Sequence, residues 1–358
     1  MEIFFNIYQD NFFLLSIILQ LILLLFFSSI NWNKVYSFFG VKKYEGIQRL
    51  HSTKTEISRF GGFAIYLSLF FYFIFYKSLG DEVDSLLGYI IFCSIPIIII
   101  SLLEDIYHNI SPSIRLFSIL LSSFLFLFFQ KNGLPFIEIP YLEFINNYKF
   151  LSLSLFALFL SGLANGMNLI DGTNGLASTT TIAGYASLSF LSYFTNDFNF
   201  LYIFIILFFY NFLFLIFNYP WGKIFLGDLG AYFNGWTLGA LTITFFASHP
   251  EIPTWNAVLL LFYPSFEIIF SFSRKLLQGK SPFLPDGSHL HLKVYFLFSR
   301  SISSRKVSNC LVMPFLTVFW MAPCMLIPWV FTHIYLIMLS IIVLIVCYLS
   351  IYHFIPEK

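Results

Sequence analysis

The sequence has little charge for its length. Only 10% of its 358 residues are charged, while 58% are hydrophobic and 22% are aromatic. This leaves too few polar side chains to cover a water-soluble globule of that size. The net charge of +1 and the lack of a dense basic run argue against nucleic acid as a partner. The composition therefore indicates a polytopic membrane protein.

The sequence also lacks the usual cysteine frameworks. Its four cysteines all lie in apolar stretches, and no two have CxxC spacing. This excludes a disulfide scaffold and the common zinc sites. No Lys or Arg precedes the first apolar run, and no small-residue cleavage pattern follows it. We therefore expect that run to be an uncleaved first span and not a signal peptide.

What the sequence has in abundance is apolar stretches long enough to cross a bilayer, which takes roughly 17–25 residues. They predict an all-α, polytopic bundle of about 10–11 transmembrane helices in a single domain, 1–358. The stretches are 11–30, 60–78, 86–103, 113–130, 149–165, 175–195, 200–217, 230–247, 255–273, 309–330 and 332–354.

The distribution of Lys and Arg predicts the orientation, because cytoplasmic loops retain these residues. One set of loops and helix ends holds sixteen of them, and the opposite set holds only Lys77, Lys131 and Lys149. This bias predicts an N-terminus outside and a C-terminus inside the cytoplasm; in a bacterial inner (plasma) membrane the N-terminus would be periplasmic.

Five polar segments interrupt the apolar chain, and an even number of predicted spans separates each from the next. All five are therefore predicted to face the cytoplasm, in catalytic loops near 31–59, 104–113, 165–175, 218–230 and 274–308. The segments are 49–62, 104–115, 165–177, 225–230 and 281–293.

The third segment carries Asn165, Asn168 and Asp171 at every third position, followed by Gly172. On a helix this spacing puts polar groups on a shared stripe at the membrane face. A polar helix end followed by an Asn-Gly turn would also explain a single such residue. Three together, at the edge of a span, favour a functional site.

Acidic residues also lie at the ends of two other predicted spans. Glu104 and Asp105 follow the third span, 86–103, and Asp228 comes after the seventh, 200–217. Glu104 and Asp105 lie at a helix C-terminus, where the macrodipole disfavours them, so a divalent cation or Arg115 must compensate their charge. His108 in the same turn receives no role. Asp228, between glycines, would alone be a turn residue. Together with Asn168, Asp171 and Asp105 it offers the oxygen ligands that Mg²⁺ prefers.

The fifth segment contains His289 and His291, two positions apart in a stretch predicted to be an extended loop, where both would share one face. Together with Lys293 and Arg274, charged imidazoles could bind phosphate oxygens by charge-assisted hydrogen bonds. The alternative is a basic loop that only enforces topology. Lys54 lies in the first segment, ahead of Arg59, Gly61 and Gly62.

The order of these motifs from about Arg49 to Lys293 resembles that of the bacterial polyprenyl-phosphate N-acetylhexosamine-1-phosphate transferases of the glycosyltransferase family 4 type. This superfamily contains undecaprenyl-phosphate GlcNAc-1-phosphate transferases and phospho-MurNAc-pentapeptide transferases. The most specific pieces are residues 165–177, Phe225-Leu-Gly-Asp-Leu-Gly230 and Ser281-Pro-Phe-Leu-Pro-Asp-Gly-Ser-His-Leu-His291.

The resemblance implies a reaction in which a polyprenyl (undecaprenyl) phosphate attacks the β-phosphorus of a UDP-N-acetylhexosamine and releases UMP. The resemblance also implies Mg²⁺ as a cofactor, for which Mn²⁺ could substitute. It leaves open whether the protein forms a homodimer. The implied roles are metal binding by Asn168 and Asp228, catalysis by Asp105 with Glu104 and Asp171, and substrate binding by Asn165, Asn174, Arg115, His289, His291 and Lys54.

Several residues depart from the family pattern. The acidic pair reads Glu104-Asp105, Asn174 stands where many members carry Asp, and the prolines common before the Arg-x-Gly-Gly signature are absent. The His-Leu-His motif in place of three histidines favours a simple N-acetylhexosamine donor, serving O-antigen, lipopolysaccharide, capsule or a related surface glycan. The alternatives are a pentapeptide transferase of peptidoglycan synthesis and, in a different class, a polytopic transporter.

Overall fold

The computed structural model describes residues 11–32, 34–35, 57–75, 81–138, 141–281 and 287–356, and within these ranges it contains helices and no strand. The predicted all-α class is therefore confirmed for the described part of the chain. The helices are α2 (Asn11–Ser29), α4 (Gly61–Phe75), α5 (Asp81–Cys93), α6 (Ile95–Tyr107), α7 (Pro112–Phe129), the 3₁₀ helix η2 (Glu143–Asn147), α8 (Lys149–Ile170), α9 (Leu176–Phe194), α10 (Phe198–Asn218), α11 (Gly227–Ser248), α12 (Trp255–Leu260), α13 (Phe262–Leu277), α14 (Leu290–Ser301), α15 (Arg305–Cys310), α16 (Val312–Phe315), α17 (Val318–Val330) and α18 (Ile334–Phe354).

The described residues contain six helices that are long and apolar enough to cross a membrane, or seven if the bent pair of α5 and α6 is one span. The six are α2, α7, α8, α10, α18 and the broken run Arg305–Val330. The polytopic bundle is thus confirmed, and each of the eleven predicted stretches coincides with a helix or a broken helix. The number of predicted spans, about eleven, exceeds the six or seven found because several of these helices are too short, too broken or too polar to be recognised as membrane spans.

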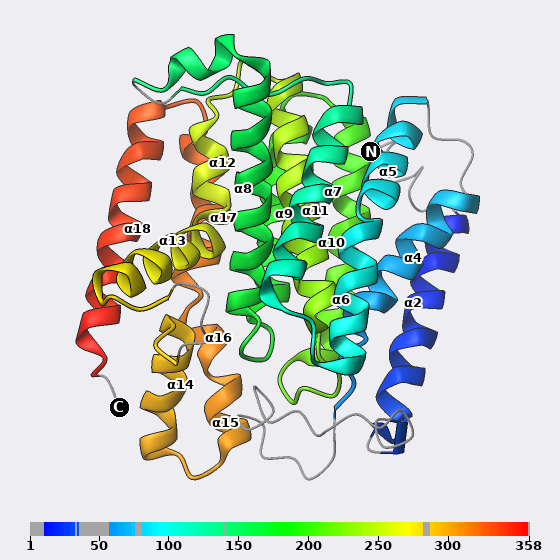
Figure 1. Ribbon diagram of the computed structural model, residues 1–358, viewed down its shortest axis with the longest axis vertical. Coiled ribbons are helices and arrows are strands. Elements are labelled where there is room, and N and C mark those ends of the chain that lie inside the picture. The colour runs from blue at the N-terminus through cyan, green and yellow to red at the C-terminus, as the bar shows by residue number, and fades with distance from the viewer. Residues whose placement is uncertain are drawn as a thin grey trace.

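Helix α11 is the clearest example of a helix that is too polar. It lies inside the bundle (Figure 1), packs against α4, α6, α8 and α9, and is buried from Gly227 to Phe246. Several of its polar side chains form hydrogen bonds inside the protein: the Thr242 hydroxyl donates to the Leu238 carbonyl at 2.7 Å, and the Asn234 amide donates to Asn211 Oδ1 at 2.7 Å. Because no face of it needs to contact lipid, α11 can use Gly, Thr and Asn where a lipid-facing span needs apolar residues.

Proline breaks two of the predicted spans. The stretch 86–103 bends by 42° around Ser94, and Pro96 lies in the first turn of the helix that follows. The stretch 255–273 ends as α12 at Leu260, and α13, which carries Pro264 near its start, turns aside and runs across the bundle (Figure 1). A proline in the first turn has no N–H to lose there, so a new helix begins readily at such a point.

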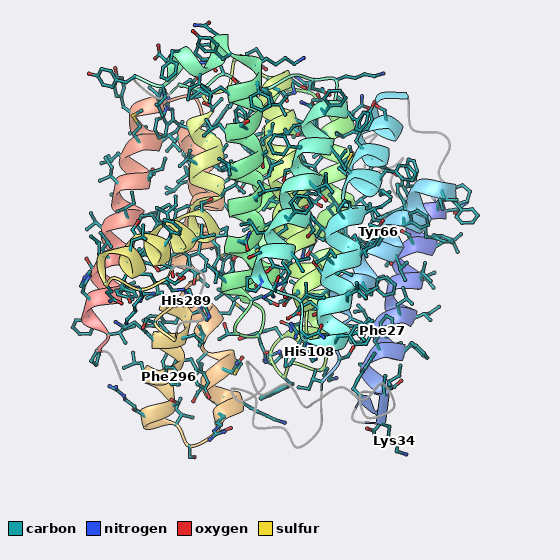
Figure 2. The ribbon with its side chains drawn as sticks, viewed as in Figure 1. Phe27, Lys34, Tyr66, His108, His289 and Phe296 are labelled. Carbon is teal, nitrogen blue, oxygen red and sulfur yellow. The ribbon has the colours of Figure 1, made fainter. Side chains whose placement is uncertain are left out.

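The ends of these helices bring the polar segments together. The C-terminal ends of α6, α8 and α10 and the N-terminal ends of α7, α9 and α11 lie at one end of the bundle, the lower end in Figure 1, near α14 and α15. Figure 2 shows His108 and His289 toward this same end.

Candidate functional site

The segment ahead of α4 is joined to the loop ahead of α11 by three backbone hydrogen bonds. The Phe225 N–H donates to the Ser58 carbonyl at 2.8 Å, and the N–H groups of Gly61 and Gly62 donate to the carbonyls of Phe225 and Leu226 at 3.0 and 2.8 Å. This pairing fixes the first polar segment against the fourth. It carries Arg59 toward the start of α11.

Asp105 connects the end of α6 to the start of α11. Its Oδ1 accepts a hydrogen bond from the Asp228 N–H at 2.9 Å, and its Oδ2 accepts one from the Leu229 N–H at 3.0 Å. The Arg59 Nε lies 3.1 Å from the same Oδ1. Asp105 is unfavourable at the C-terminus of its own helix, but here it meets the positive N-terminus and unpaired N–H groups of another helix. These contacts compensate the negative charge of Asp105, as its position at the end of α6 requires.

Asp228 is held between two arginines. Its Oδ1 lies 2.7 Å from the Arg59 Nη2, and its Oδ2 lies 2.6 Å from the Arg115 Nη1. The Asn168 amide also donates to Oδ1, at 3.4 Å. These are charge-assisted hydrogen bonds between largely buried groups, so they are stronger than ion pairs at a protein surface.

Asp105, Asp228, Arg59, Arg115 and Asn168 thus form one network of ion pairs and hydrogen bonds. Glu104 and His108 lie at its edge. The Glu104 Oε2 accepts from the Ile110 N–H at 2.8 Å, while its Oε1 is 3.7 Å from Arg115, which pairs more closely with Asp228. The Nδ1 of His108 lies 3.2 Å from the Arg59 Nη1. Burial, followed by the positive charge of Arg59, lowers the pKa of His108 to about 4, so at neutral pH this nitrogen can accept the bond. The sequence had given His108 no role.

Asp171 follows the last residue of α8 and is half-buried. Desolvation raises its pKa well above the usual value; the Arg59 charge opposes this rise, and the charges of Asp228 and Asp105 add to it. Asp171 is therefore within electrostatic reach of the same network. An acid in such surroundings is a candidate functional group.

The raised pKa of Asp171 predicts how stability depends on pH. A carboxyl whose pKa is raised by folding favours the folded state fully below its unfolded value near 3.8, and this contribution is lost as pH rises through the folded pKa. Asp171→Asn avoids that loss, so its melting temperature should rise relative to that of the native chain as the pH increases from 3.8 through the raised pKa of Asp171. Glu143→Gln, which changes an exposed acid, is the control. An Asp171→Asn difference that is constant with pH would contradict the assignment.

The fifth polar segment, 281–293, which carries His289 and His291 and is called the histidine segment below, contacts the third polar segment at Gly172. A Cβ added to Gly172 would overlap the Nε2 of His291 and lie 2.8 Å from its Cδ2. The two imidazoles stack, with ring centroids 5.8 Å apart and an interplanar angle of 10°. The expectation of an extended loop was wrong from Leu290 onward, where α14 begins, but His289 itself has extended backbone angles, and this lets both rings share a face.

His289 is oriented by a buried acid. Its Nδ1 lies 3.0 Å from the Glu267 Oε1 on α13, and the Tyr348 hydroxyl donates to Glu267 Oε2 at 2.6 Å. Burial, followed by the charge of His289, lowers the pKa of His291 to about 3. As a neutral imidazole at pH 7, His291 can donate a hydrogen bond to a phosphate oxygen but brings no positive charge, contrary to the role expected from the sequence.

Two further predicted residues form hydrogen bonds to groups outside the network. The Asn165 amide donates to the Ser161 carbonyl of its own helix at 2.8 Å. Asn174 is 3% exposed and links α15 to the loop after α10: its N–H donates to Asn309 Oδ1 at 2.9 Å, and its amide donates to the Pro220 carbonyl at 2.8 Å. Lys54 lies outside the described residues.

The structure adds two residues that the sequence did not assign to the site. Arg59 lies in the Arg-x-Gly-Gly signature but was not assigned a role, because one Arg in a cytoplasmic loop also fits a role in topology. Glu267 was overlooked although it is an acid inside a predicted span, and such a residue is a functional candidate by default.

The oxygen donors at the centre fit a magnesium ion. No group of three or more His, Cys, Asp or Glu side chains in the described residues forms a metal site. Mg²⁺, however, needs only one or two protein ligands, because water and substrate phosphates complete its octahedron. Asn168 and Asp228 are in contact and offer amide and carboxylate oxygens. In this structure the Asp228 oxygens are paired with arginines.

In a comparison with known proteins, one family matches part of this chain. The model of glycosyl transferase family 4 matches residues 87–246. This range contains Asp105, Arg115, Asn168 and Asp228, but Arg59 and the histidine segment, 281–293, lie outside it.

Two curated proteins that are similar to this chain are named as undecaprenyl-phosphate N-acetylglucosaminyl 1-phosphate transferases. The chain is 32% identical over 162 residues to an undecaprenyl-phosphate alpha-N-acetylglucosaminyl 1-phosphate transferase of Thermotoga maritima, over 44% of this chain and 46% of that protein. It is 26% identical over 196 residues to a probable undecaprenyl-phosphate N-acetylglucosaminyl 1-phosphate transferase of Bacillus subtilis, over 54% of each.

A phospho-N-acetylmuramoyl-pentapeptide-transferase of Streptococcus pneumoniae is 23% identical over 266 residues, 71% of this chain and 79% of that protein. The chain spans about half the length of the first two relatives. The resemblance carried by the motifs is confirmed: residues 87–246 match the model of glycosyl transferase family 4, and the similar curated proteins include both kinds of transferase that the motifs resemble.

Proposed function

We propose that this protein transfers a sugar 1-phosphate from a UDP-N-acetylhexosamine to a polyprenyl phosphate, undecaprenyl phosphate in bacteria, and releases UMP. The observation that carries the proposal is the network around Asp228. Asp105 and Arg115 come from one polar segment, Arg59 and Asp228 come from two others far away in the sequence, and all four meet at one end of the bundle. Fixed charges of both signs at one face suit a diphosphate held with a cation.

In the proposed reaction a lipid phosphate oxygen forms a bond to the β-phosphorus of the donor, and the bond from that phosphorus to the bridging oxygen breaks. The electron pair leaves with UMP, so charge builds up on phosphate oxygens. Positioning and charge neutralisation supply most of the catalysis in such transfers. Bound Mg²⁺, held by Asn168 and Asp228, would neutralise charge on the diphosphate.

The remaining residues act through position and charge. Arg59 and Arg115 are set to bond phosphate oxygens, because arginine pairs well with phosphate. Asp105 holds the start of α11, and therefore Asp228, through its two backbone hydrogen bonds. The catalytic role that the resemblance implies for Asp105 remains a prediction; in this structure both of its oxygens accept hydrogen bonds.

The sugar is the least constrained part of the proposal. The two more identical relatives carry N-acetylglucosaminyl in their names, and the His-Leu-His motif favours the same branch. The pentapeptide transferase remains the second candidate, because that relative matches a larger share of this chain. A transporter receives no support from a polar network gathered at one end.

The direct test uses membranes that contain the protein, UDP-sugars and undecaprenyl phosphate. With Mg²⁺ we expect release of UMP and a lipid diphosphate whose mass shows one N-acetylhexosamine, and we expect both products to be lost with a chelator. Preference for UDP-MurNAc-pentapeptide would establish the second candidate. Absence of a lipid product with every donor would contradict the transferase.

We also propose that the end carrying the network faces the cytoplasm, as the loop charges predict. Single cysteines at Lys223 and Tyr141, both exposed and at opposite ends of the bundle, test this in a background without the native cysteines. In intact cells an impermeant thiol reagent should label Tyr141→Cys, and it should label Lys223→Cys only after the membrane is opened. The reverse pattern would overturn the orientation.

A further inference from the structure

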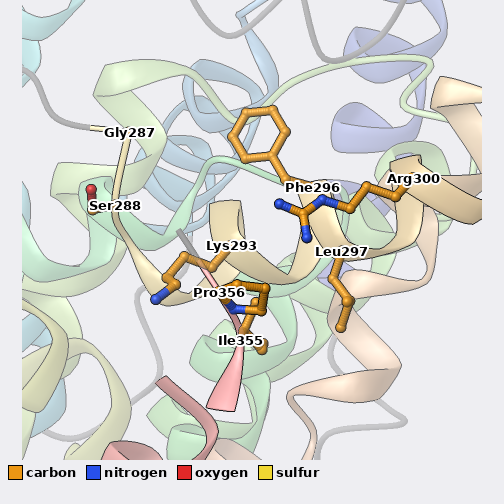
Figure 3. Close-up of a pocket in the computed structure, with 8 residues that line it drawn as sticks. All are labelled: Gly287, Ser288, Lys293, Phe296, Leu297, Arg300, Ile355 and Pro356. Atoms are coloured by element: carbon orange, nitrogen blue, oxygen red, sulfur yellow. The ribbon is translucent and has the colours of Figure 1, made fainter. Parts of the chain in front are cut away.

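A cavity of about 250 Å³ lies between α14 and the chain that follows α18 (Figure 3). Its polar lining includes Lys293, Arg300 and Ser288, and its apolar lining includes Phe296, Leu297 and Ile355. The cavity therefore combines two basic side chains with an apolar wall, which suits an anionic group attached to an apolar body.

The position of the cavity matches the boundary of a membrane. Ile355 directly follows α18, one of the helices apolar enough to span a bilayer. The neighbouring Phe354 is 88% exposed, and Leu277 at the end of α13 is 90% exposed. Large apolar side chains that are this exposed near the end of a span indicate contact with lipid at that level. Basic pockets between helices at this depth bind the headgroups of anionic lipids.

The two cations differ in how they are held. Lys293 is only 7% exposed; its ammonium donates to the Tyr352 carbonyl at 2.8 Å and lies 4.1 Å from the centre of the Tyr352 ring. Arg300 is exposed in the last turn of α14. One charge is thus fixed in the wall of the cavity, and the other lies at its rim with five N–H donors.

We propose that this cavity binds a phosphate group, and that the phosphate is the headgroup of an anionic phospholipid. Lys293 and Arg300 bond its oxygens, while Phe296, Leu297 and Ile355 contact the apolar part of the lipid. Free phosphate offers the same oxygens but nothing for the apolar wall, so the lipid makes the larger set of contacts. None of the lining residues takes part in the contacts around Asp228.

The test measures lipid binding directly, so it does not depend on the transferase activity. The purified chain in a neutral detergent is titrated with phosphatidylglycerol and, separately, with phosphatidylcholine, and bound lipid is counted by native mass spectrometry. Arg300→Gln should weaken phosphatidylglycerol binding about fivefold, since one basic residue near a membrane surface contributes about 1 kcal/mol. The matched control is Lys306→Gln, which removes an exposed charge outside the cavity; it should leave affinity unchanged.

Four results would overturn the proposal. Equal weakening by both variants would show that surface charge attracts the lipid without this cavity, and no weakening by either variant would show that Arg300 does not bind the lipid. Full competition by inorganic phosphate would show that the ligand is free phosphate and not a lipid. Full competition by UDP would place the cavity within the nucleotide site. Because Arg300 is exposed, the variant should fold, and an unchanged melting temperature without lipid checks this.

Discussion

Asp228→Ala should reduce the rate of sugar-phosphate transfer by on the order of 10³-fold or more, since loss of one preorganised electrostatic contact commonly costs 10²–10³-fold. Here the same carboxylate is also a proposed metal ligand, and it pairs with Arg59 and Arg115. The measurement is UMP release at saturating donor and Mg²⁺.

The alanine variant leaves two arginines without their carboxylate, so it can lose stability as well as activity. Asp228→Asn keeps the size and one acceptor oxygen and separates these effects. It should fold with a melting temperature close to that of the native chain and still lose activity. Glu251→Ala, which removes an exposed acid at the other end of the bundle, is the activity control. Turnover of Asp228→Asn equal to that of the native chain would remove Asp228 from the mechanism.

Gly62→Ala is expected to have the largest effect on folding. A Cβ at Gly62 would overlap the Cα and N atoms of Gly230 and lie 2.9 Å from the Leu226 carbonyl oxygen. These are backbone atoms, so α4 and α11 must move apart. Overpacking of this kind typically costs about 1–3 kcal/mol, occasionally more, which exceeds the roughly 1 kcal/mol that Ala gains over Gly in a helix.

The same change should disturb the site. Because Gly62 donates to Leu226 next to the pair of Arg59 and Asp228, separating α4 from α11 weakens that ion pair. We expect a lower melting temperature and lower activity together. Gly162→Ala is the matched control, since nothing lies within 4 Å of a Cβ at Gly162. Equal melting temperatures for the two variants would contradict the close helix contact.

The sequence alone was sufficient for the general arrangement. Apolar stretches located the helices, because each needs roughly 20 residues to cross the bilayer. Counting the crossings placed the five polar segments on one side, and the structure brings a residue from each of them, Arg59, Asp105, Gly172, Asp228 and His291, to the same end of the bundle. The motif around Asn168 and the turn at Asp228 identified the residues at its centre.

The sequence could not supply the pairings. Asp105 bonds the N–H of a residue 123 positions away, and no local pattern shows which helix end will meet it. The charge of His291 was misjudged for a related reason: its pKa depends on burial, which arises only when the segment packs against Gly172. Glu267 was detectable as an acid in an apolar stretch, but its partner His289 was not.

The most direct test of the account is to locate the metal. Crystals of the protein grown with Mn²⁺ and a UDP-N-acetylhexosamine should show one anomalous peak in contact with Asp228 and Asn168 and with the donor diphosphate. Arg59 or Arg115 should lie against the same phosphates. A peak held by other side chains, or a diphosphate bound away from this end of the bundle, would contradict the account.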